Sequence, residues 1–480
     1  MAELTVRKVK ESLSEKVNRE LTLKEQISLT MSLSAPAIMA QLSSICMQYI
    51  DAAMVGSLGA LASAAIGLMM APLWLFTGIC LSSVSGYSVQ VAHLLGARDE
   101  VAARAVLRQA YVVMLGFAAL VAALGCAISP VLPYWLGSNE VELIAADASS
   151  YFMVFMAGLP FFMFNYLSAA MLRCSGNMLL PSLLNVLMCL LDVVFNFFLI
   201  FPSRSATYPL IGTIDVYGAG LGVTGAALGT AGAAAVTGLI MTYCLCFKSR
   251  SLAFTLDPLS LKAFVPTWQV VRRALRISLP ITGQQVMISS AQIVSTMIVA
   301  PLGNMSIAAH SFAITIEALC YMPGFGIGDA ATTLVGQSIG ARRFDLTRRF
   351  AVITLCLGAG IMALMGFLMY VFSPWVMSLM SPSVEVQELA VQALRIEAFA
   401  EPLFAVAIVG YGICVGAGDT LIPSLINLGS MWLIRLGLAY ALAQHYGLAG
   451  VWTAMCIELC LRGCFFLARL KWGNWVKTLD

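Results

Sequence analysis

The stretch VAHLLGARDEVAAR, residues 91–104, reappears in altered form as VGQSIGARRFDLTR at residues 335–348, and this recurrence decides the fold. The two copies begin 244 residues apart (335 minus 91), and each carries Gly-Ala-Arg at the same place, at 96–98 and 340–342. Self-similarity at a fixed distance indicates a repeated architecture. The chain is therefore expected to fold as two related halves.

Other segments repeat with nearly the same offset. Pro36 meets Pro280 at 244 residues, and farther along the offset becomes 242. There GNMLLPSLLN, at 176–185, meets GDTLIPSLIN, at 418–427. These matches extend the duplication over most of the 480 residues.

The composition is that of a membrane protein. Hydrophobic residues make up 60% of the chain and charged residues only 11%, too few charges for the surface of a soluble protein of this length. We find no P-loop, nucleotide fingerprint or nucleophile motif, so we expect no enzyme, no cofactor and no nucleic-acid partner. The 13 cysteines stand singly in apolar segments, which is typical of small packing residues, and the three histidines form no metal set.

Apolar runs long enough to cross a bilayer can be marked between polar breaks. The first 26 residues are polar and charged and contain no cleavable signal. Twelve spans are predicted after them, at 27–56, 62–86, 103–128, 148–172, 179–201, 218–247, 271–300, 306–334, 347–372, 389–415, 421–444 and 447–470.

Positive charges alternate between loops and set the orientation. The N-terminal tail, the loops after spans two and eight, the segment after span six and the C-terminal end are rich in Lys and Arg. The loops at 129–147 and 373–388 carry no Lys or Arg, and the loop at 203–218 has only Arg204. By the positive-inside rule both termini are cytoplasmic, in agreement with an even number of spans.

Because each copy holds six spans, both copies enter the membrane in the same direction. Such parallel repeats are related by an axis along the membrane normal and form two lobes that rock to alternate access. The predicted division is a cytoplasmic tail at 1–26, an N-lobe at 27–247, a cytoplasmic linker at 248–270, a C-lobe at 271–470 and a cytoplasmic tail at 471–480. A duplication can also serve only to stabilise a helical bundle; we favour a pump or flippase, since a channel would need a recognisable filter.

Ionisable groups that occur inside the spans of only one copy are the best functional candidates. Asp51 maps to a serine in the second half, whereas Asp192 and Asn196 map to an isoleucine and a leucine. Asp192 and Asn196 are four residues apart and thus lie on one helical face. With Thr230 of span six, they and Asp51 form a set of hard oxygen ligands suited to a proton or Na⁺. The alternative is that Asp51 snorkels to the headgroups and Asp192 makes only a helix–helix hydrogen bond.

The second half has intramembrane acids of its own. Glu317, Asp329, Glu397 and Glu401 fall in spans eight and ten, and Arg435 in span eleven needs an anion or water. Glu317 is best placed to contact a cationic substrate, whereas Asp329 could instead pair with an arginine at the inner rim. For each of these groups a structural pairing is the alternative reading.

Three glutamines and two of the acids complete the predicted substrate-binding set. The candidates are Gln41, Gln284, Gln285, Glu317 and Glu401.

Taken together, the motifs resemble those of the multidrug and toxic compound extrusion (MATE) family over essentially the whole chain. The resemblance is carried by DAAMVGSLG (51–59), GVTGAALGT (222–230), LVGQSIGARR (334–343) and the repeated CSGNMLLPSLLN (174–185) and GAGDTLIPSLIN (416–427). It implies an all-α membrane protein of twelve helices in two six-helix lobes around a central cavity.

The resemblance also implies the activity, which is export of organic cations and amphipathic drugs against inward H⁺ or Na⁺. In prokaryotic relatives the N-lobe cation site uses an Asp of the first helix, an Asn and an Asp four apart on the fifth, and a Thr of the sixth. Asp51 and Thr230 match the ends of this pattern, but Asp192 and Asn196 stand in the reverse order. Another branch places a glutamate on helix seven, where this chain has Ile288.

A plasma-membrane (inner-membrane) exporter, working as a monomer, is the favoured interpretation. The alternative is a flippase for lipid-linked precursors, or an exporter of one specific metabolite, within the same superfamily. A flippase for pyrophosphate-linked lipids would favour more spans or a strongly cationic cavity, and few basic residues fall within the spans.

Overall fold

The computed structural model describes residues 12–136, 141–208, 212–254 and 261–476. The first half is helical except for one hairpin. Its elements are α1 (Leu13–Val17), α2 (Leu23–Gly56), α3 (Ala60–Gly96), α4 (Glu100–Ile128), α5 (Leu132–Leu136), η1 (Val141–Leu143), α6 (Ala145–Cys174), α7 (Leu179–Ile200), β1 (Pro202–Tyr208), β2 (Gly212–Ala219), α8 (Gly222–Tyr243) and η2 (Cys244–Lys248).

The described part of the second half consists only of helices. Its elements are η4 (Leu261–Phe264), α9 (Trp268–Val299), η5 (Ala300–Leu302), α10 (Asn304–Gly340), α11 (Phe344–Met380), α12 (Val384–Glu397), α13 (Glu401–Gly416), α14 (Leu421–Gly429), η6 (Ser430–Arg435) and α15 (Leu436–Trp472).

These helices supply twelve membrane-length segments. Ten helical stretches are long and apolar enough to cross a membrane, and the bent pair α12 and α13, which turns by 60°, makes an eleventh. The last stretch, Leu421–Trp472, contains a break at Gly447, whose φ of 56° and ψ of −136° are not helical. Division at this glycine gives two spans, so the fold holds the twelve helices predicted from the sequence.

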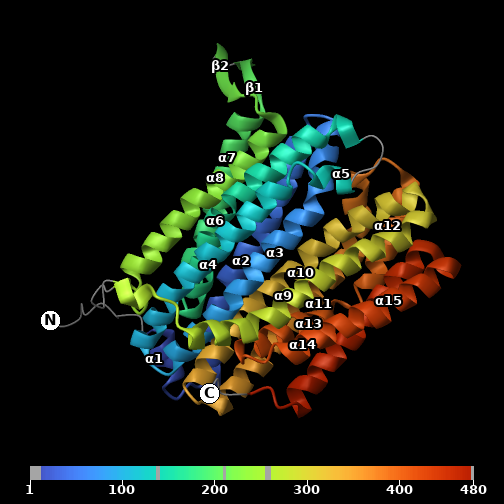
Figure 1. Cartoon of the computed structure of the whole chain (residues 1–480). Helices are drawn as coiled ribbons and strands as arrows, with labels where there is room; N and C mark the ends of the chain where they lie inside the picture. Colours follow the sequence, from blue (N-terminus) through green and yellow to red (C-terminus); the bar gives the residue numbers. More distant parts are fainter. Residues whose placement is uncertain (1–11, 137–140, 209–211, 255–260, 477–480) are drawn as a thin grey trace.

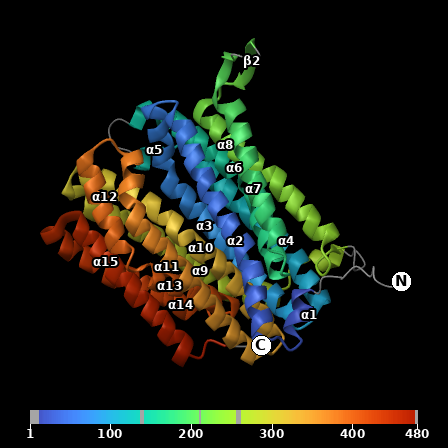
Figure 2. The same ribbon diagram turned by 180° about the vertical axis from the view of Figure 1, so that it is seen from behind.

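The helices of each half pack mainly on one another. In Figure 1 the first half, blue to green, lies on one side and the second half, yellow to red, on the other, and Figure 2 shows the same division from behind. One large apolar core lies within residues 80–274 and another within residues 299–454. The halves meet where α2 packs on α10 and α3 packs on α9, two contacts that the duplication relates to each other.

The repeated Gly-Ala-Arg motif has the same backbone in both halves. Arg98 and Arg342 have φ values of 62° and 56°, in the left-handed region that only a few non-glycine residues adopt. In each copy the motif ends one long helix, α3 or α10, and the next begins within two residues, at Glu100 or Phe344. The motif that reveals the duplication in the sequence thus builds equivalent turns.

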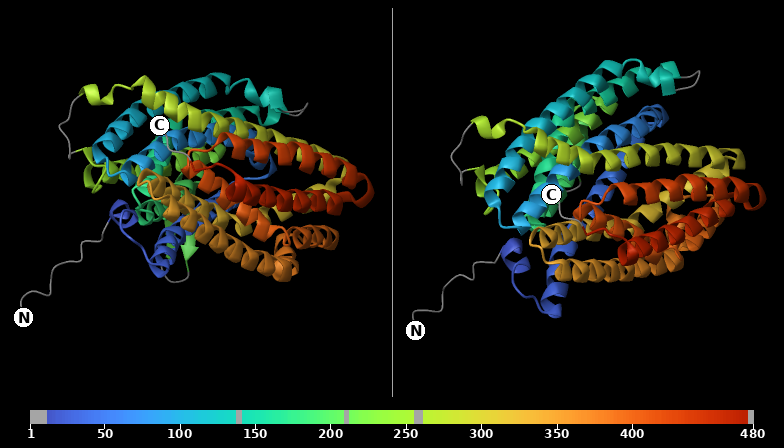
Figure 3. Two further views of the ribbon diagram at one scale, coloured as in Figure 1. Left: turned by 90° about the horizontal axis from the view of Figure 1, so that it is seen from below. Right: turned by 60° about the horizontal axis from the view of Figure 1, so that its bottom comes forward.

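The N-terminal segment packs against the second half. Thr22 and Glu25 form a reciprocal capping box at the start of α2, as the Thr-x-x-Glu spacing favours. Leu13, Val17 and Leu33 are buried in one cluster with residues 330–350 of α10 and α11. Figure 3 shows this dark-blue segment beside those helices. The predicted polar tail at 1–26 therefore contains a short packed helix and the first turn of α2.

A two-stranded antiparallel hairpin occupies the predicted loop between spans five and six. It pairs Tyr208 with Gly212 and continues to Pro202 opposite Ala219, with an irregularity near Arg204. The hairpin projects from the end of the bundle opposite α1 (Figure 1). Span six accordingly begins at Gly222, four residues later than predicted, because 218–219 belong to the hairpin.

Candidate functional site

Three of the predicted N-lobe site residues are joined by hydrogen bonds. Asn196, on α7, donates from Nδ2 to Oδ1 of Asp51 on α2 at 2.9 Å and to Oδ2 of Asp192, one turn earlier on α7, at 3.1 Å. One amide group therefore holds a carboxylate from each of two helices. The four-residue spacing that placed Asp192 and Asn196 on one face is what allows this bridge.

This cluster is deeply buried and has unused acceptors. Asp192 and Asn196 are both 0% exposed. Within the described residues, Oδ1 of Asp192 and Oδ1 of Asn196 have no hydrogen-bond partner. Buried polar atoms are nearly always satisfied, so these two oxygens call for a ligand.

The two carboxyl groups also face each other. Both accept from the same amide group of Asn196, so Asp51 and Asp192 are close neighbours. Ionised carboxylates have acceptors only, so they can come this close without strong repulsion only if a proton or a metal cation lies between them. A proton or a monovalent cation shared by the two carboxyl groups would relieve this repulsion.

The fourth predicted residue, Thr230 on α8, lies at the edge of this cluster. Its hydroxyl donates to the carbonyl of Ala226 at 3.1 Å, and the side chain interacts electrostatically with Asp192. The preceding residue, Gly229, sets the distance between α7 and α8, because a Cβ atom there would lie 2.0 Å from Oδ1 of Asn196. Glycine is required at this position if Asn196 is to remain where it bridges the two acids.

The second half contains a separate buried charge cluster. Glu458 on α15 is 0% exposed and accepts from two arginines: Nε of Arg435 at 2.9 Å, and Nε and Nη2 of Arg462 at 2.7 and 2.8 Å. This pairing supplies the anion that Arg435 was expected to need. Glu458 and Arg462 were not predicted as site residues, although their spacing of four in an apolar span is the signal of an intrahelical ion pair.

Three further acids lie near this ion-pair triad. Glu317 on α10 is 6% exposed, and Glu397 and Glu401, which flank the bend between α12 and α13, are 0% exposed. Glu397 interacts electrostatically with Glu317, Glu401, Arg435 and Glu458. Glu317 and Glu401 were predicted as substrate-binding residues; the structure places them in one cluster.

Two of the three predicted glutamines lie between the halves. Gln41 on α2 donates to Oδ2 of Asp329 on α10 at 3.3 Å, so these two residues connect the halves. Arg343, one of the two arginines (with Arg342) that could have paired with Asp329, lies instead beside Asp345, with 3.2 Å between its Nε and Oδ1 of Asp345. Gln285 on α9 packs against Gly78 of α3, also between the halves.

The halves touch most closely where α3 and α10 end. A Cβ atom on Gly96 would lie 2.0 Å from the carbonyl oxygen of Gln337, and one on Gly340 would lie 1.9 Å from that of His93. His93 Nε2 also pairs with the carbonyl of Gly416 at 2.8 Å. Two reciprocal backbone contacts therefore close the end of the bundle at which α1 lies (Figure 1).

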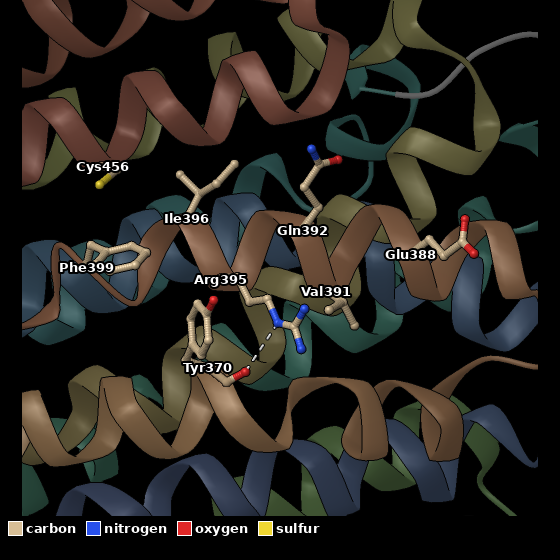
Figure 4. A pocket seen from close by; sticks show the side chains of 8 residues that line it. All are labelled: Tyr370, Glu388, Val391, Gln392, Arg395, Ile396, Phe399 and Cys456. Atoms are coloured by element: carbon tan, nitrogen blue, oxygen red, sulfur yellow. Dashed lines mark hydrogen bonds between the residues drawn. The ribbon is translucent and has the colours of Figure 1, made fainter.

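A groove of about 580 Å³ runs along α12, bounded also by α11 and α15. Its lining includes Glu388, Gln392 and Arg395, which project from successive turns of α12, and Cys456 of α15 (Figure 4). Arg395 lies over the ring of Tyr370, with 5.2 Å between its Cζ and the ring centroid. The lining also includes Val391, Ile396 and Phe399, so it combines charged and amide groups with apolar ones.

The fold and its buried charge clusters define a polytopic membrane transporter built from two related lobes. The chain belongs to the MatE family, that is, the multidrug and toxic compound extrusion family, whose model matches it twice, at residues 36–198 and 280–441. The two matches begin 244 residues apart, the same offset as the repeated motifs. Members of this family are transporters rather than enzymes and need no cofactor.

Individual relatives match over nearly the full length of the chain. A probable multidrug resistance protein NorM of Oceanobacillus iheyensis is 27% identical over 459 residues, which cover 94% of this chain and 97% of that protein. A probable multidrug resistance protein NorM of Thermotoga maritima is 24% identical over 434 residues, with 89% and 88% covered.

Solved structures share the fold. A crystal structure of a MATE protein in complex with MaL6 matches with a TM-score of 0.82 at 22% identity, covering 95% of this chain and 98% of that one. The structure of a MOP superfamily transporter from Pyrococcus furiosus matches with a TM-score of 0.84 at 21% identity, covering 96% of this chain and 98% of that one.

Proposed function

We propose that this protein is a secondary active exporter that moves organic cations and amphipathic drugs out of the cell against inward H⁺ or Na⁺. The observation that carries the proposal is the buried bridge in which Asn196 holds the carboxyl groups of Asp51 and Asp192 together. A buried acidic pair with unused oxygens is costly to retain for packing alone, since intramembrane acids usually mark ion pathways. The names of the relatives, multidrug resistance proteins, agree with a drug substrate.

The coupling step follows from charge. With a proton or Na⁺ between Asp51 and Asp192 the cluster carries about one negative charge less, and α2, α7 and α8 can pack closely. When the ion leaves, the two carboxylates repel each other, by about 4 kcal/mol at 4 Å for an effective dielectric constant of 20. A change of this size is enough to shift a two-state equilibrium between lobe arrangements more than a hundredfold.

The choice of ion depends on ligand number. Na⁺ would take both carboxylates, Oδ1 of Asn196 and the hydroxyl of Thr230, whereas a proton needs only the two carboxyl groups. The reversed order of Asp192 and Asn196 leaves the same chemical groups on α7, so the site can serve either ion.

The protein lies in the plasma (inner) membrane as a monomer with both termini cytoplasmic, and residues 27–247 and 271–470 are the two lobes that alternate access. The contacts at Gly96 and Gly340 then close the cytoplasmic side, because the termini and the basic loops lie at that end.

The test is export in cells. Asp51→Asn and Asp192→Asn should each abolish resistance to an added cationic dye or fluoroquinolone at unchanged membrane levels, because neither variant can exchange the charge. Ser295→Ala, at the second-half position equivalent to Asp51, is the matched control and should export normally. Wild-type resistance in both Asn variants would overturn the N-lobe coupling proposal.

A further inference from the structure

Arg395 of α12 is an exposed cation on a membrane-length part of the C-lobe. It lines the groove between α11, α12 and α15, and it lies six residues inside the predicted span 389–415. α11 and α15, which flank the groove, belong to segments long and apolar enough to cross a membrane. A charged side chain that faces lipid is costly unless it pairs with an anion or reaches the headgroups. Arg395 therefore needs an anionic partner.

The protein supplies only part of the contacts that this guanidinium group can make. Nε of Arg395 donates to the carbonyl of Tyr370 at 3.4 Å, and its Cζ lies 5.2 Å from the centroid of the same residue's ring. These contacts use one of the five N–H groups and one face of the guanidinium plane. Among the described residues, no carboxylate forms an ion pair with Arg395. Its two Nη atoms are left for a ligand from outside the chain.

Arg395 reaches the level at which lipid headgroups lie. Side chains on a helix lean toward its N-terminal end, and in α12 this end follows the predicted outer loop 373–388. The guanidinium group thereby meets Tyr370, only two residues from the end of the predicted span 347–372. Trp375 of α11 follows and is 63% exposed, as is typical of aromatic residues at the membrane–water interface. The anion at this depth is the phosphate of a phospholipid.

A second charge, of opposite sign, lines the same groove. Glu388 is exposed on α12, seven residues before Arg395 and so about 10 Å nearer the outer loop. Gln392 lies between them along the helix, and Figure 4 shows all three side chains. The groove thus presents a cation at the deeper position and a carboxylate at the outer one. A zwitterionic headgroup has the complementary order, because its phosphate lies next to the glycerol and its ammonium group at the outer end.

The rest of the lining suits an acyl chain. Ile396 and Phe399 lie beyond Arg395 toward the middle of the membrane, and Phe399 is 72% exposed. The groove volume of about 580 Å³ falls within the range of pockets that hold small organic ligands, roughly 300–1,000 Å³. A charged outer part continued by an apolar inner part matches an amphipathic ligand.

The first half of the chain shows that the fold does not need these charges. Pro160 meets Pro402 at the offset of 242, and the same offset places Met153 at the position of Arg395 and Ala146 at that of Glu388. Met153 is 43% exposed, so it too lies on the outside of its lobe. The charged pair is specific to the C-lobe, which favours a ligand over a structural role.

We propose that the groove along α12 binds one phosphatidylethanolamine molecule from the outer leaflet. Arg395 pairs with the phosphate, for which a planar guanidinium group is well shaped, and Glu388 accepts hydrogen bonds from the ammonium group. The acyl chains run over Ile396 and Phe399. The proposal shares with the proposed function only the orientation of the chain in the membrane; it involves neither the transported compound nor the coupling ion.

The two charges predict which headgroups are rejected. Phosphatidylglycerol has a phosphate but no ammonium group, so Glu388 would face it without a counter-ion. Phosphatidylcholine has a quaternary ammonium group, which carries no N–H and cannot donate to Glu388. Both lipids keep the pairing with Arg395 and lose the one with Glu388, so both should bind more weakly than phosphatidylethanolamine.

Native mass spectrometry of the purified full-length protein, titrated with the three lipids at matched acyl chains, tests the site. The wild type should bind one phosphatidylethanolamine about fivefold more tightly than either other lipid. Arg395→Met, which installs the residue of the first half, should weaken this binding at least about tenfold. Met153→Ala is the matched control and should bind as the wild type does. Equal binding of the three lipids by the wild type, or wild-type binding by Arg395→Met, would overturn the proposal.

Glu388→Gln gives a second test that does not depend on Arg395. This variant should still bind phosphatidylethanolamine but no longer prefer it to phosphatidylcholine, and a retained preference would refute the role of Glu388. Soluble phosphoethanolamine should not displace the lipid at equal concentration, because it lacks the acyl chains; displacement would refute a lipid site. None of these outcomes bears on export, so the lipid site can fail while the proposed function stands, and the reverse.

Discussion

Replacement of Gly229 by alanine tests the geometry of the N-lobe site without removing any of its polar groups. A Cβ atom at position 229 would lie 2.0 Å from Oδ1 of Asn196, whereas an ordinary contact needs about 3.4 Å. Asn196 must therefore move by about 1.4 Å, or α7 and α8 must separate by as much. Since Asn196 holds Asp51 at 2.9 Å and Asp192 at 3.1 Å, either movement breaks at least one of the two bonds.

Two contributions set the size of the effect, the overpacking of the helix contact and the loss of a hydrogen bond. Overpacking a dense helix contact costs about 1–3 kcal/mol, and a hydrogen bond to a charged group contributes about 1.5–3 kcal/mol. A loss of about 1.5–3 kcal/mol at the site corresponds to roughly a 10- to 150-fold weaker affinity for the coupling ion, at 1.4 kcal/mol per factor of ten. Export should fall at least tenfold when the ion gradient is small and recover in part when the gradient is steep.

The matched control is Gly232→Ala, one turn farther along α8. Its Cβ atom would lie 3.4 Å from the ring of Phe195, an ordinary contact, and so Asn196 need not move. The assay is initial-rate export of a fluorescent cation in everted vesicles at several gradient sizes, with transporter levels matched. Equal ion dependence in Gly229→Ala, Gly232→Ala and the wild type would refute the role given to the Asn196 bridge.

Three further substitutions probe the second half and the contact between the lobes. Glu458→Ala leaves two buried arginines without their anion and should lower the free energy of unfolding in detergent by about 3–5 kcal/mol; an unchanged denaturation curve would contradict the buried triad. Glu317→Gln should change the range of exported cations more than the ion dependence, as a panel of substrates would show, and an unchanged panel would count against it. Gly340→Ala should force apart the ends of α3 and α10 and so increase the reaction of nearby cysteines with a thiol reagent. Gly360→Ala, which has open space around it, should leave this reaction unchanged. Equal labelling of the two variants would mean that the contact at Gly340 does not hold this end closed.

Much of the architecture could be predicted because its signals are periodic or repeated. Twelve apolar runs and a duplicated Gly-Ala-Arg turn are enough to derive two six-helix lobes. The strands Pro202–Tyr208 and Gly212–Ala219 were not predicted, because these short stretches of mixed small, polar and aromatic residues have no hydrophobic face to bury and lie between two much stronger helical signals. The start of span six was misplaced for the same reason.

The N-lobe site was partly predictable from local spacing along one helix and from comparison of the two halves. Asp192 and Asn196 are neighbours on one helix, so their spacing predicts a shared face, and comparison of the two halves identified Asp51 as unusual. The hydrogen bond between Asn196 and Asp51 joins residues 145 positions apart and depends on how α2 packs on α7. Glu458 was not predicted as the partner of Arg435. An acid four residues before an arginine on one helix is already paired with that arginine, and only the packing of η6 against α15 brings Arg435 to it.

Reconstitution into liposomes tests the central claim most directly, namely that the Asp51–Asn196–Asp192 cluster couples ion entry to export. Accumulation of tetraphenylphosphonium is measured with only a pH gradient, and then with only a Na⁺ gradient, for the wild type and for Asp192→Asn. We predict that at least one gradient drives accumulation by the wild type and that neither drives it by the variant, although the variant still binds the cation. Gradient-driven accumulation by Asp192→Asn at the wild-type rate would contradict the claim.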